Sequence, residues 1–119
     1  VQHAAIEALT GDQKCVSEHN AIYQSRRDRL VTVLRDLGLA IRLPQASLYV
    51  WARIPHSYTS IGFTAKILEE IGIAVTPGVG YGPQGEGYIR LSITLPDADL
   101  EEGLGRLRQW KIEDTPGTE

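Results

Sequence analysis

Several residue types are scarce or missing in this chain. Its 119 residues include no methionine, one phenylalanine and one cysteine, Cys15. A single cysteine excludes a disulfide framework and a thiolate metal cluster, and it is typical of a reducing, cytoplasmic setting. No apolar run approaches the roughly 20 residues that cross a membrane, and no signal-peptide pattern opens the chain. The missing methionine is expected equally of a chain that has lost its initiator residue before Val1 and of a segment of a longer polypeptide.

Charge of neither sign dominates. The net charge is −3, with acidic and basic residues mixed throughout, so nucleic acid is not an expected partner. Lysine occurs only as Lys14, Lys66 and Lys111, each at a helical position where the pattern predicts exposure. A catalytic lysine needs burial or a nearby cation, so none of the three is expected to be catalytic. The histidines are far apart and have no cysteine partner, so no metal site is expected.

Hydrophobic periodicity predicts one α+β domain in two layers, a small and mostly antiparallel sheet with helices packed on one face. Ser60 is expected to cap the third helix, and the short 43–47 connection to make the first two strands an antiparallel pair. The tail 113–119 (EDTPGTE) is polar and turn-rich and is expected to be flexible. The expected helices are 2–9, 12–37, 60–71 and one that begins at Pro96, and the expected strands are 39–43, 47–54, 73–75 and 88–94.

The most informative segment is a glycine-rich turn that leads into a strand with an arginine at its centre. Alternation along 88–94 places Ile89, Leu91 and Ile93 on one face and Arg90 on the other. An arginine held on a strand beside such a loop can bind a carboxylate or phosphate through two parallel hydrogen bonds. Spacing alone leaves open an ordinary arginine on a solvent-exposed face. The glycines of the turn are Gly78, Gly80, Gly82, Gly85 and Gly87.

Residues 80–85 (GYGPQG) match the letters of a dinucleotide fingerprint but not its context. That motif requires a helix after the glycines, because the helix N-terminus binds the pyrophosphate. Here Pro83 lies inside the match and a β-branched strand follows it. The segment therefore does not predict a dinucleotide site.

Four segments resemble one family, the class I/II, fold-type I pyridoxal-phosphate aminotransferases. They occur in the family's order, and the resemblance runs from about Gln2 to Trp110. The sequence is most similar to the branch of LL-diaminopimelate and aspartate aminotransferases. The segments are 23–30 (YQSRRDRL), 44–51 (PQASLYVW), 68–78 (LEEIGIAVTPG), and 80–82 with 85–92 (GYG, GEGYIRLS).

The resemblance implies that residues 1–112 are the C-terminal small domain of such an enzyme, together with the end of its connecting long helix. It implies that Arg90 binds the α-carboxylate of an amino-acid or 2-oxo-acid substrate and that Tyr81 lies near it. Gly78 and Gly80 would let the loop pass close to the substrate entrance. The implied parent is a cytoplasmic homodimer with pyridoxal phosphate as cofactor, in which a large domain is the partner of this one.

The family's Schiff-base lysine and its main cofactor-binding residues have no counterpart in this chain. No catalytic residue is therefore assigned, and the isolated chain is expected not to catalyse transamination. The alternative is a non-enzymatic domain, derived from a truncated aminotransferase, that binds a small molecule or a partner. The sequence does not indicate which amino acid is the substrate.

Overall fold

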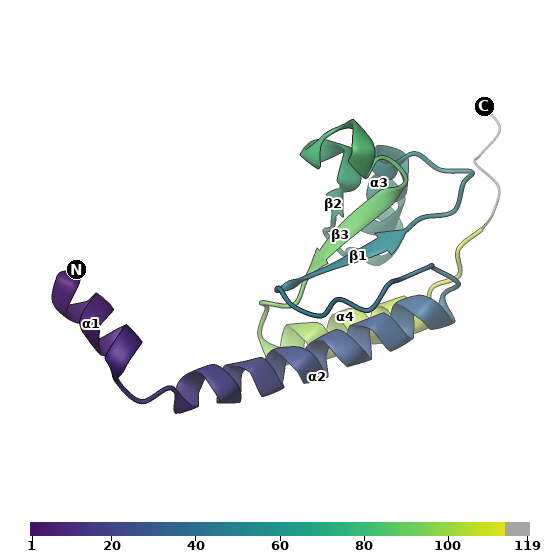
Figure 1. The fold of residues 1–119 in the computed structure, drawn as a ribbon. Helices are drawn as coiled ribbons and strands as arrows, with labels where there is room; N and C mark the ends of the chain where they lie inside the picture. Colours follow the sequence, from purple (N-terminus) through teal and green to yellow (C-terminus); the bar gives the residue numbers. More distant parts are fainter. Residues whose placement is uncertain (114–119) are drawn as a thin grey trace.

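The structure is a computed structural model that describes residues 1–113 (Figure 1). Of the tail predicted to be flexible, all but Glu113 lies outside the described residues. Among the described residues, no helix combines the length and apolar character that crossing a bilayer requires. The helices are α1 (Gln2–Thr10), α2 (Lys14–Asp36), α3 (Ser60–Ile71) and α4 (Asp97–Gln109); the strands are β1 (Tyr49–Arg53), β2 (Thr76–Pro77) and β3 (Tyr88–Ser92); two 3₁₀ turns, η1 (Gly78–Tyr81) and η2 (Pro83–Gly85), separate β2 from β3.

The three strands form one antiparallel sheet in the order β1-β3-β2, so β3 lies in the middle. Side chains alternate in burial along β1 and β3, as their period of two predicts. Val50, Ala52, Ile89 and Leu91 point into the core. The predicted α+β fold class is confirmed.

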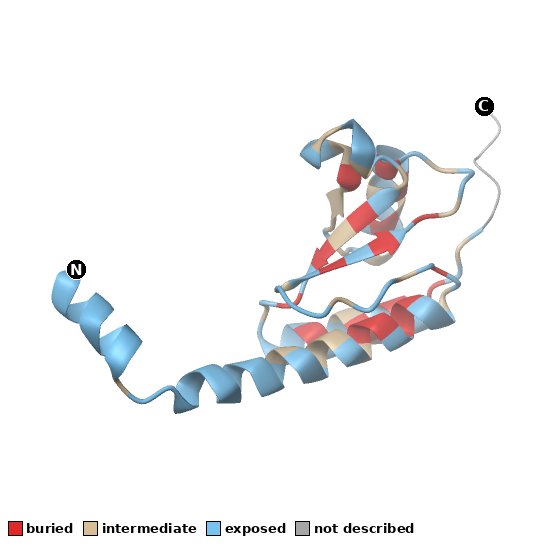
Figure 2. Ribbon diagram, in the orientation of Figure 1, coloured by how far each residue is buried: buried red, intermediate tan, exposed pale blue. Residues whose placement is uncertain are grey.

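Helices cover the core side of the sheet, and the other side faces solvent. In Figure 1, α3 lies behind the sheet, and α2 and α4 run side by side below it. Figure 2 shows the buried positions gathered between these helices and the strands. As the sequence predicts, α4 buries one side at helical spacing. Trp110, just after the helix ends, is buried with that side in the core. The helical contributions to the core are Leu30, Val31, Val33, Leu34, Phe63, Ile67, Leu100, Leu104 and Leu107.

Helix α1 stands apart from this core. None of its residues is buried, and Ile6 and Leu9 are largely exposed. Together with the exposed start of α2 it stretches the molecule to 60 Å in its longest dimension. This end of the chain therefore presents apolar side chains that the described residues do not cover.

The strand predicted over 39–43 is wrong. The predicted antiparallel pair with the next strand is reduced to an isolated bridge between Ala40 and Arg53. Arginines of α2 bind carbonyl groups within this segment and directly after it: Arg35 donates to Ile41 O at 3.0 Å and Arg27 to Pro44 O at 2.8 Å. The segment is thus held along the helix, and its one bridge to β1 involves Arg53, which also pairs with Tyr88 of β3.

Two smaller predictions also need correction. The strand expected over 73–75 lies slightly later, as the two-residue strand Thr76–Pro77. Helix α3 spans the predicted residues, but its cap is Thr59, whose hydroxyl accepts a hydrogen bond from Gly62 N at 3.1 Å. Ser60 is the first helical residue and is fully buried, and its side chain has a different partner.

Candidate anion site around Arg90

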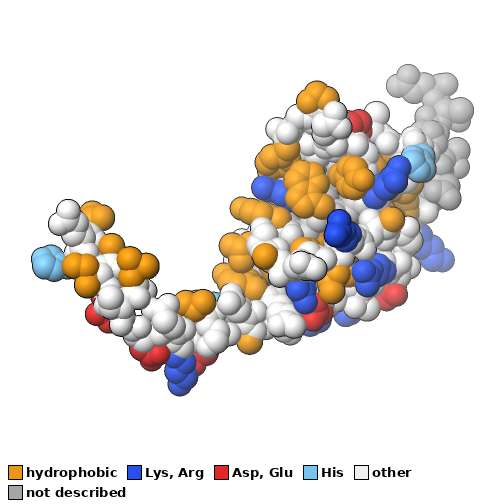
Figure 3. All heavy atoms as spheres, in the orientation of Figure 1, with side chains coloured by type: hydrophobic (Ala, Val, Ile, Leu, Met, Phe, Trp, Pro, Cys, Tyr) orange, Lys and Arg blue, Asp and Glu red, His pale blue; other side chains and the backbone are white. Residues whose placement is uncertain are grey.

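Arg90 occupies the centre of the middle strand and points to the solvent side of the sheet. Its backbone neighbours are Trp51 on β1 and Thr76 on β2. The side chain is half-buried, because aromatic residues surround it on a face that has no helix. Figure 3 shows hydrophobic and basic side chains gathered together over the sheet on this side of the molecule.

Two tyrosine rings lie against the guanidinium group of Arg90. The guanidinium carbon is 4.0 Å from the centroid of the Tyr49 ring and 4.4 Å from that of Tyr81. The Tyr81 ring also meets Trp51 edge-on, with centroids 5.5 Å apart. Cation–π contacts of this kind attract the cation to the ring faces. They leave the N–H groups, which point outward in the guanidinium plane, to bind an anion.

No acidic side chain within residues 1–113 forms an ion pair with Arg90, and its guanidinium has no hydrogen-bond partner there. Several other arginines, though not all, differ in this respect. Arg26 pairs with Asp97 at 2.7 Å, and Arg29 and Arg106 pair with Glu101 and Glu102. The N–H groups of this half-buried guanidinium are therefore open to an anion from outside the described residues.

The glycine loop that carries Tyr81 is closed by a backbone contact. A Cβ atom added to Gly78 would lie 2.0 Å from Gly85 O, so neither glycine has room for a side chain. Gly82 and Gly87 have φ angles of 114° and 84°, which favour glycine. At Gly80, by contrast, a Cβ atom would meet no atom within 4 Å. Gly78 and Gly85 are therefore the two positions at which the backbone of this loop approaches itself too closely for a side chain.

Glu86 ties the end of this loop to the start of α3. Its carboxylate accepts hydrogen bonds from Ser60 N at 2.7 Å, Ser60 Oγ at 2.9 Å and Gly87 N at 3.0 Å. These hydrogen bonds, the one from Ser60 N first, lower the pKa of the Glu86 carboxyl. The charge also lies at a helix N-terminus, where an anion is stabilised.

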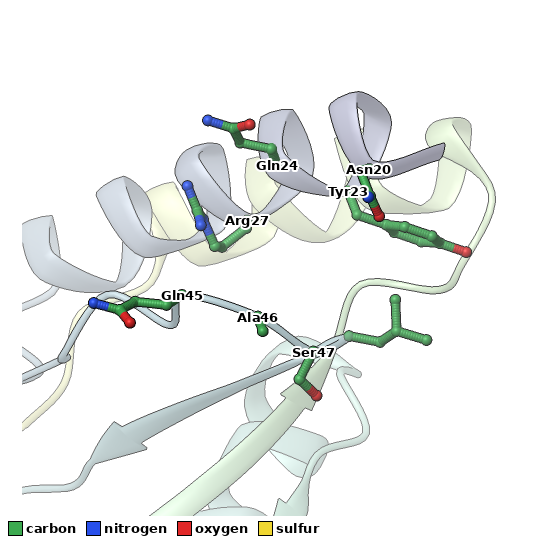
Figure 4. Close-up of a pocket in the computed structure, with 8 residues that line it drawn as sticks. Asn20, Tyr23, Gln24, Arg27, Gln45, Ala46 and Ser47 are labelled. Atoms are coloured by element: carbon green, nitrogen blue, oxygen red, sulfur yellow. The ribbon is translucent and has the colours of Figure 1, made fainter. Parts of the chain in front are cut away.

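A hollow of about 340 Å³ lies elsewhere, between α2 and residues 45–48 (Figure 4). Ser47 stands beside it with a φ of 80°, an unusual value for a residue other than glycine. Arg27 lines the hollow, but its guanidinium already binds Asp28 at 2.7 Å and Pro44 O at 2.8 Å. Because its cation is satisfied, this hollow is a weaker anion site than the face around Arg90.

The structure brings two of the expected site residues together, Arg90 and Tyr81. Sequence reasoning missed Tyr49 and Trp51, whose alternation in β1 places them on one face but does not say which strand lies beside them. It also missed the link between Ser60 and Glu86, for which no local pattern exists. Within residues 1–113, no group of three or more histidine, cysteine or acidic side chains is arranged to hold a metal ion.

Comparison with known proteins identifies the family to which this chain belongs. The family model "Aminotransferase class I and II" matches residues 1–107. The LL-diaminopimelate aminotransferase of Dehalococcoides mccartyi is 51% identical over 111 residues, which are 93% of this chain and 29% of that protein. Among solved structures, an aromatic aminotransferase from Pyrococcus horikoshii aligns with a TM-score of 0.84 and 34% identity, over 91% of this chain and 30% of that one.

A further solved structure aligns as well. The LL-diaminopimelate aminotransferase of Chlamydomonas reinhardtii has a TM-score of 0.73 and 30% identity, over 82% of this chain and 25% of that one. The chain belongs to the class I and II aminotransferase family. It spans less than a third of the length of the curated relatives it matches.

Proposed function

We propose that this chain is the C-terminal small domain of a pyridoxal-phosphate-dependent aminotransferase, with the end of the connecting long helix, and that Arg90 binds the substrate α-carboxylate. The parent enzyme would transfer an amino group between an amino acid and a 2-oxo acid. One observation supports the role of Arg90. Arg90 lies on a rigid strand between two tyrosine rings and has no carboxylate partner among the described residues. A planar guanidinium presented in this way matches a carboxylate through two parallel hydrogen bonds.

The residues present do not form a site for the cofactor. Pyridoxal phosphate supplies the carbanion chemistry of such enzymes and requires a lysine near the substrate. Lys14 pairs with Glu18 on α2, and Lys66 pairs with Glu70 on α3, whereas Lys111 follows α4. All three lie on or beside the helices, away from the strand face that carries Arg90. The cofactor lysine would therefore come from a large domain, and the isolated chain would be inactive.

The names of the relatives suggest the first substrate to test. Several curated relatives are LL-diaminopimelate aminotransferases. The amino donor of the parent would therefore be LL-diaminopimelate or a similar amino acid. The parent would be a cytoplasmic homodimer. In the alternative function, the chain is a non-catalytic domain that uses the same arginine to bind a small acid.

A chimera tests this proposal. The chain replaces the matching segment of the Dehalococcoides mccartyi enzyme, and the amino-acid KM is measured for the unmodified chimera, for Arg90→Ala and for Arg108→Ala. Arg108 is an exposed arginine on α4 and serves as the control. Removing a charged partner from a hydrogen-bonded pair costs about 2–5 kcal/mol, so Arg90→Ala should raise KM roughly 30-fold or more. An unchanged KM in a folded, cofactor-loaded Arg90→Ala chimera would refute the role of Arg90.

The chimera also decides between the two functions. An active chimera shows that the chain retains the contribution of an aminotransferase small domain. A chimera that folds and binds cofactor but has no activity favours the non-catalytic binding domain.

A further inference from the structure

The link between Ser60 and Glu86 reaches the anion site through the glycine loop. Glu86 stands at the end of the loop, directly after η2, and Ser60 opens α3 on the core side of the sheet. Three hydrogen bonds of 2.7–3.0 Å join the Glu86 carboxylate to Ser60 and to Gly87 N. The two residues are 26 positions apart, so this contact ties the loop to a separate element of the fold.

Ser60 also contacts the beginning of the loop. Its hydroxyl oxygen lies 3.5 Å from Val79 N, at the long limit of a hydrogen bond. Ser60 is fully buried, so bulk solvent does not reach its hydroxyl. One buried hydroxyl thus lies between η1 and the residue that follows η2.

Tyr81 lies between these two attachment points. It is the last residue of η1, and its side chain is half exposed, at 51%. Its ring stays over the Arg90 guanidinium, at 4.4 Å, without burial to hold it there. Apart from the edge-on contact with Trp51, the position of the ring depends on the backbone of the loop. The contact between Gly78 and Gly85 closes this loop, and the Ser60–Glu86 link attaches it to α3.

We infer that Ser60 and Glu86 are positioning residues for the anion site, because they hold the glycine loop so that Tyr81 covers one face of the Arg90 guanidinium. The inference rests on the proposed function in one respect only, that Arg90 binds the substrate α-carboxylate. The contact between Tyr81 and Arg90 is itself measurable in the 119-residue chain. Loss of the link frees the loop and lets the ring leave the guanidinium, while Tyr49 on β1 keeps its place.

The test is the nuclear Overhauser contact between the ring protons of Tyr81 and the δ-methylene of Arg90 in the labelled 119-residue chain. Glu86→Gln and Ser60→Ala should each lose this contact and keep the one between Tyr49 and Arg90. Glu69→Gln, a change at an exposed glutamate of α3, is the matched control and should keep both. A purely structural role would lower the urea midpoint and leave the contact intact in the folded molecules.

Retention of the Tyr81 contact in a folded Glu86→Gln or Ser60→Ala chain overturns the inference. If Glu86→Gln does not fold, Ser60→Ala decides, because it removes fewer of the hydrogen bonds. These measurements need neither cofactor nor activity. The inference can therefore fail while Arg90 still binds substrate in the chimera, and it can hold while Arg90→Ala leaves the amino-acid KM unchanged.

Discussion

The guanidinium carbon of Arg90 lies 4.0 Å from the centre of the Tyr49 ring, although the two residues are not direct neighbours in the sheet. Tyr49 pairs with Ser92, and Arg90 pairs with Trp51. The contact is therefore the diagonal one between adjacent antiparallel strands, which long side chains reach. Since both residues belong to strands, this side of the guanidinium has a fixed support, whereas the Tyr81 side depends on a loop.

Replacing Tyr49 by leucine should remove this support. A cation–π contact at an exposed site is worth about 0.5–1 kcal/mol, so Tyr49→Leu should lower the free energy of unfolding by about that amount in a urea titration. Tyr49→Phe keeps the ring and should come close to the unmodified chain. Equal losses in the two variants would mean that the phenol hydroxyl, and not the ring face, holds Arg90.

The glycine loop offers a matched pair of substitutions. Gly78→Ala would place a Cβ atom 2.0 Å from Gly85 O, whereas Gly80→Ala meets no atom within 4 Å. Forcing an atom into a packed site costs about 1–3 kcal/mol. Urea unfolding should show a loss of this size for Gly78→Ala and almost none for Gly80→Ala. Similar midpoints for both variants would contradict the close approach at Gly78.

Glu70 makes the stability of the chain depend on acid pH. Lys66 beside it, at 2.5 Å, and then the indole N–H of Trp110, at 2.6 Å, lower the pKa of the Glu70 carboxyl below its ordinary 4.5. A group whose pKa is lower in the folded state stabilises the fold above its unfolded pKa, and this stabilisation is lost as pH falls through the folded value. The contribution should therefore be complete at neutral pH and disappear below about pH 4.5.

The measurement is the urea midpoint from pH 7 to pH 3 for the unmodified chain, Glu70→Gln and Glu69→Gln, with the indole N–H resonance of Trp110 followed alongside. Glu70→Gln should be less stable at neutral pH, and its difference from the unmodified chain should shrink in acid. Glu69 is exposed and serves as the control, so Glu69→Gln should follow the unmodified chain. A constant difference between Glu70→Gln and the unmodified chain across this range would contradict the assignment to Glu70.

The isolated chain should not catalyse transamination. Its lysines lie on or beside the helices, and two of them are paired with Glu18 and Glu70. The purified chain, incubated with pyridoxal phosphate, an amino acid and 2-oxoglutarate, should form no glutamate above the rate seen without protein. Turnover that persists after repeated purification would show that a lysine of this chain takes the cofactor role.

Local patterns in the sequence predict most of the helices and the orientation of Arg90. The alternation along β3 follows from side-chain period alone, and the apolar spacing of α4 follows from the helical repeat. Gly72 ends α3 in a left-handed conformation with a φ of 66°, as a glycine at that position indicates. Each of these features depends on residues that are close together in the chain.

The parts that sequence reasoning missed depend on contacts between distant residues. The segment 39–43 has strand-like composition, but Arg27 and Arg35 of α2 bind the carbonyl groups of Pro44 and Ile41 and hold it along the helix. Tyr49 meets Arg90 only because β1 pairs with β3, about 40 residues later, in one register. No pattern within either segment specifies that register or the link from Ser60 to Glu86.

The most direct test of the central claim is a crystal structure of the chimera with its cofactor and an unreactive amino-acid analogue. The account predicts that both oxygens of the α-carboxylate accept hydrogen bonds from the Arg90 guanidinium, edge-on, with the rings of Tyr49 and Tyr81 above and below. An α-carboxylate bound elsewhere, with Arg90 facing only solvent, would contradict it.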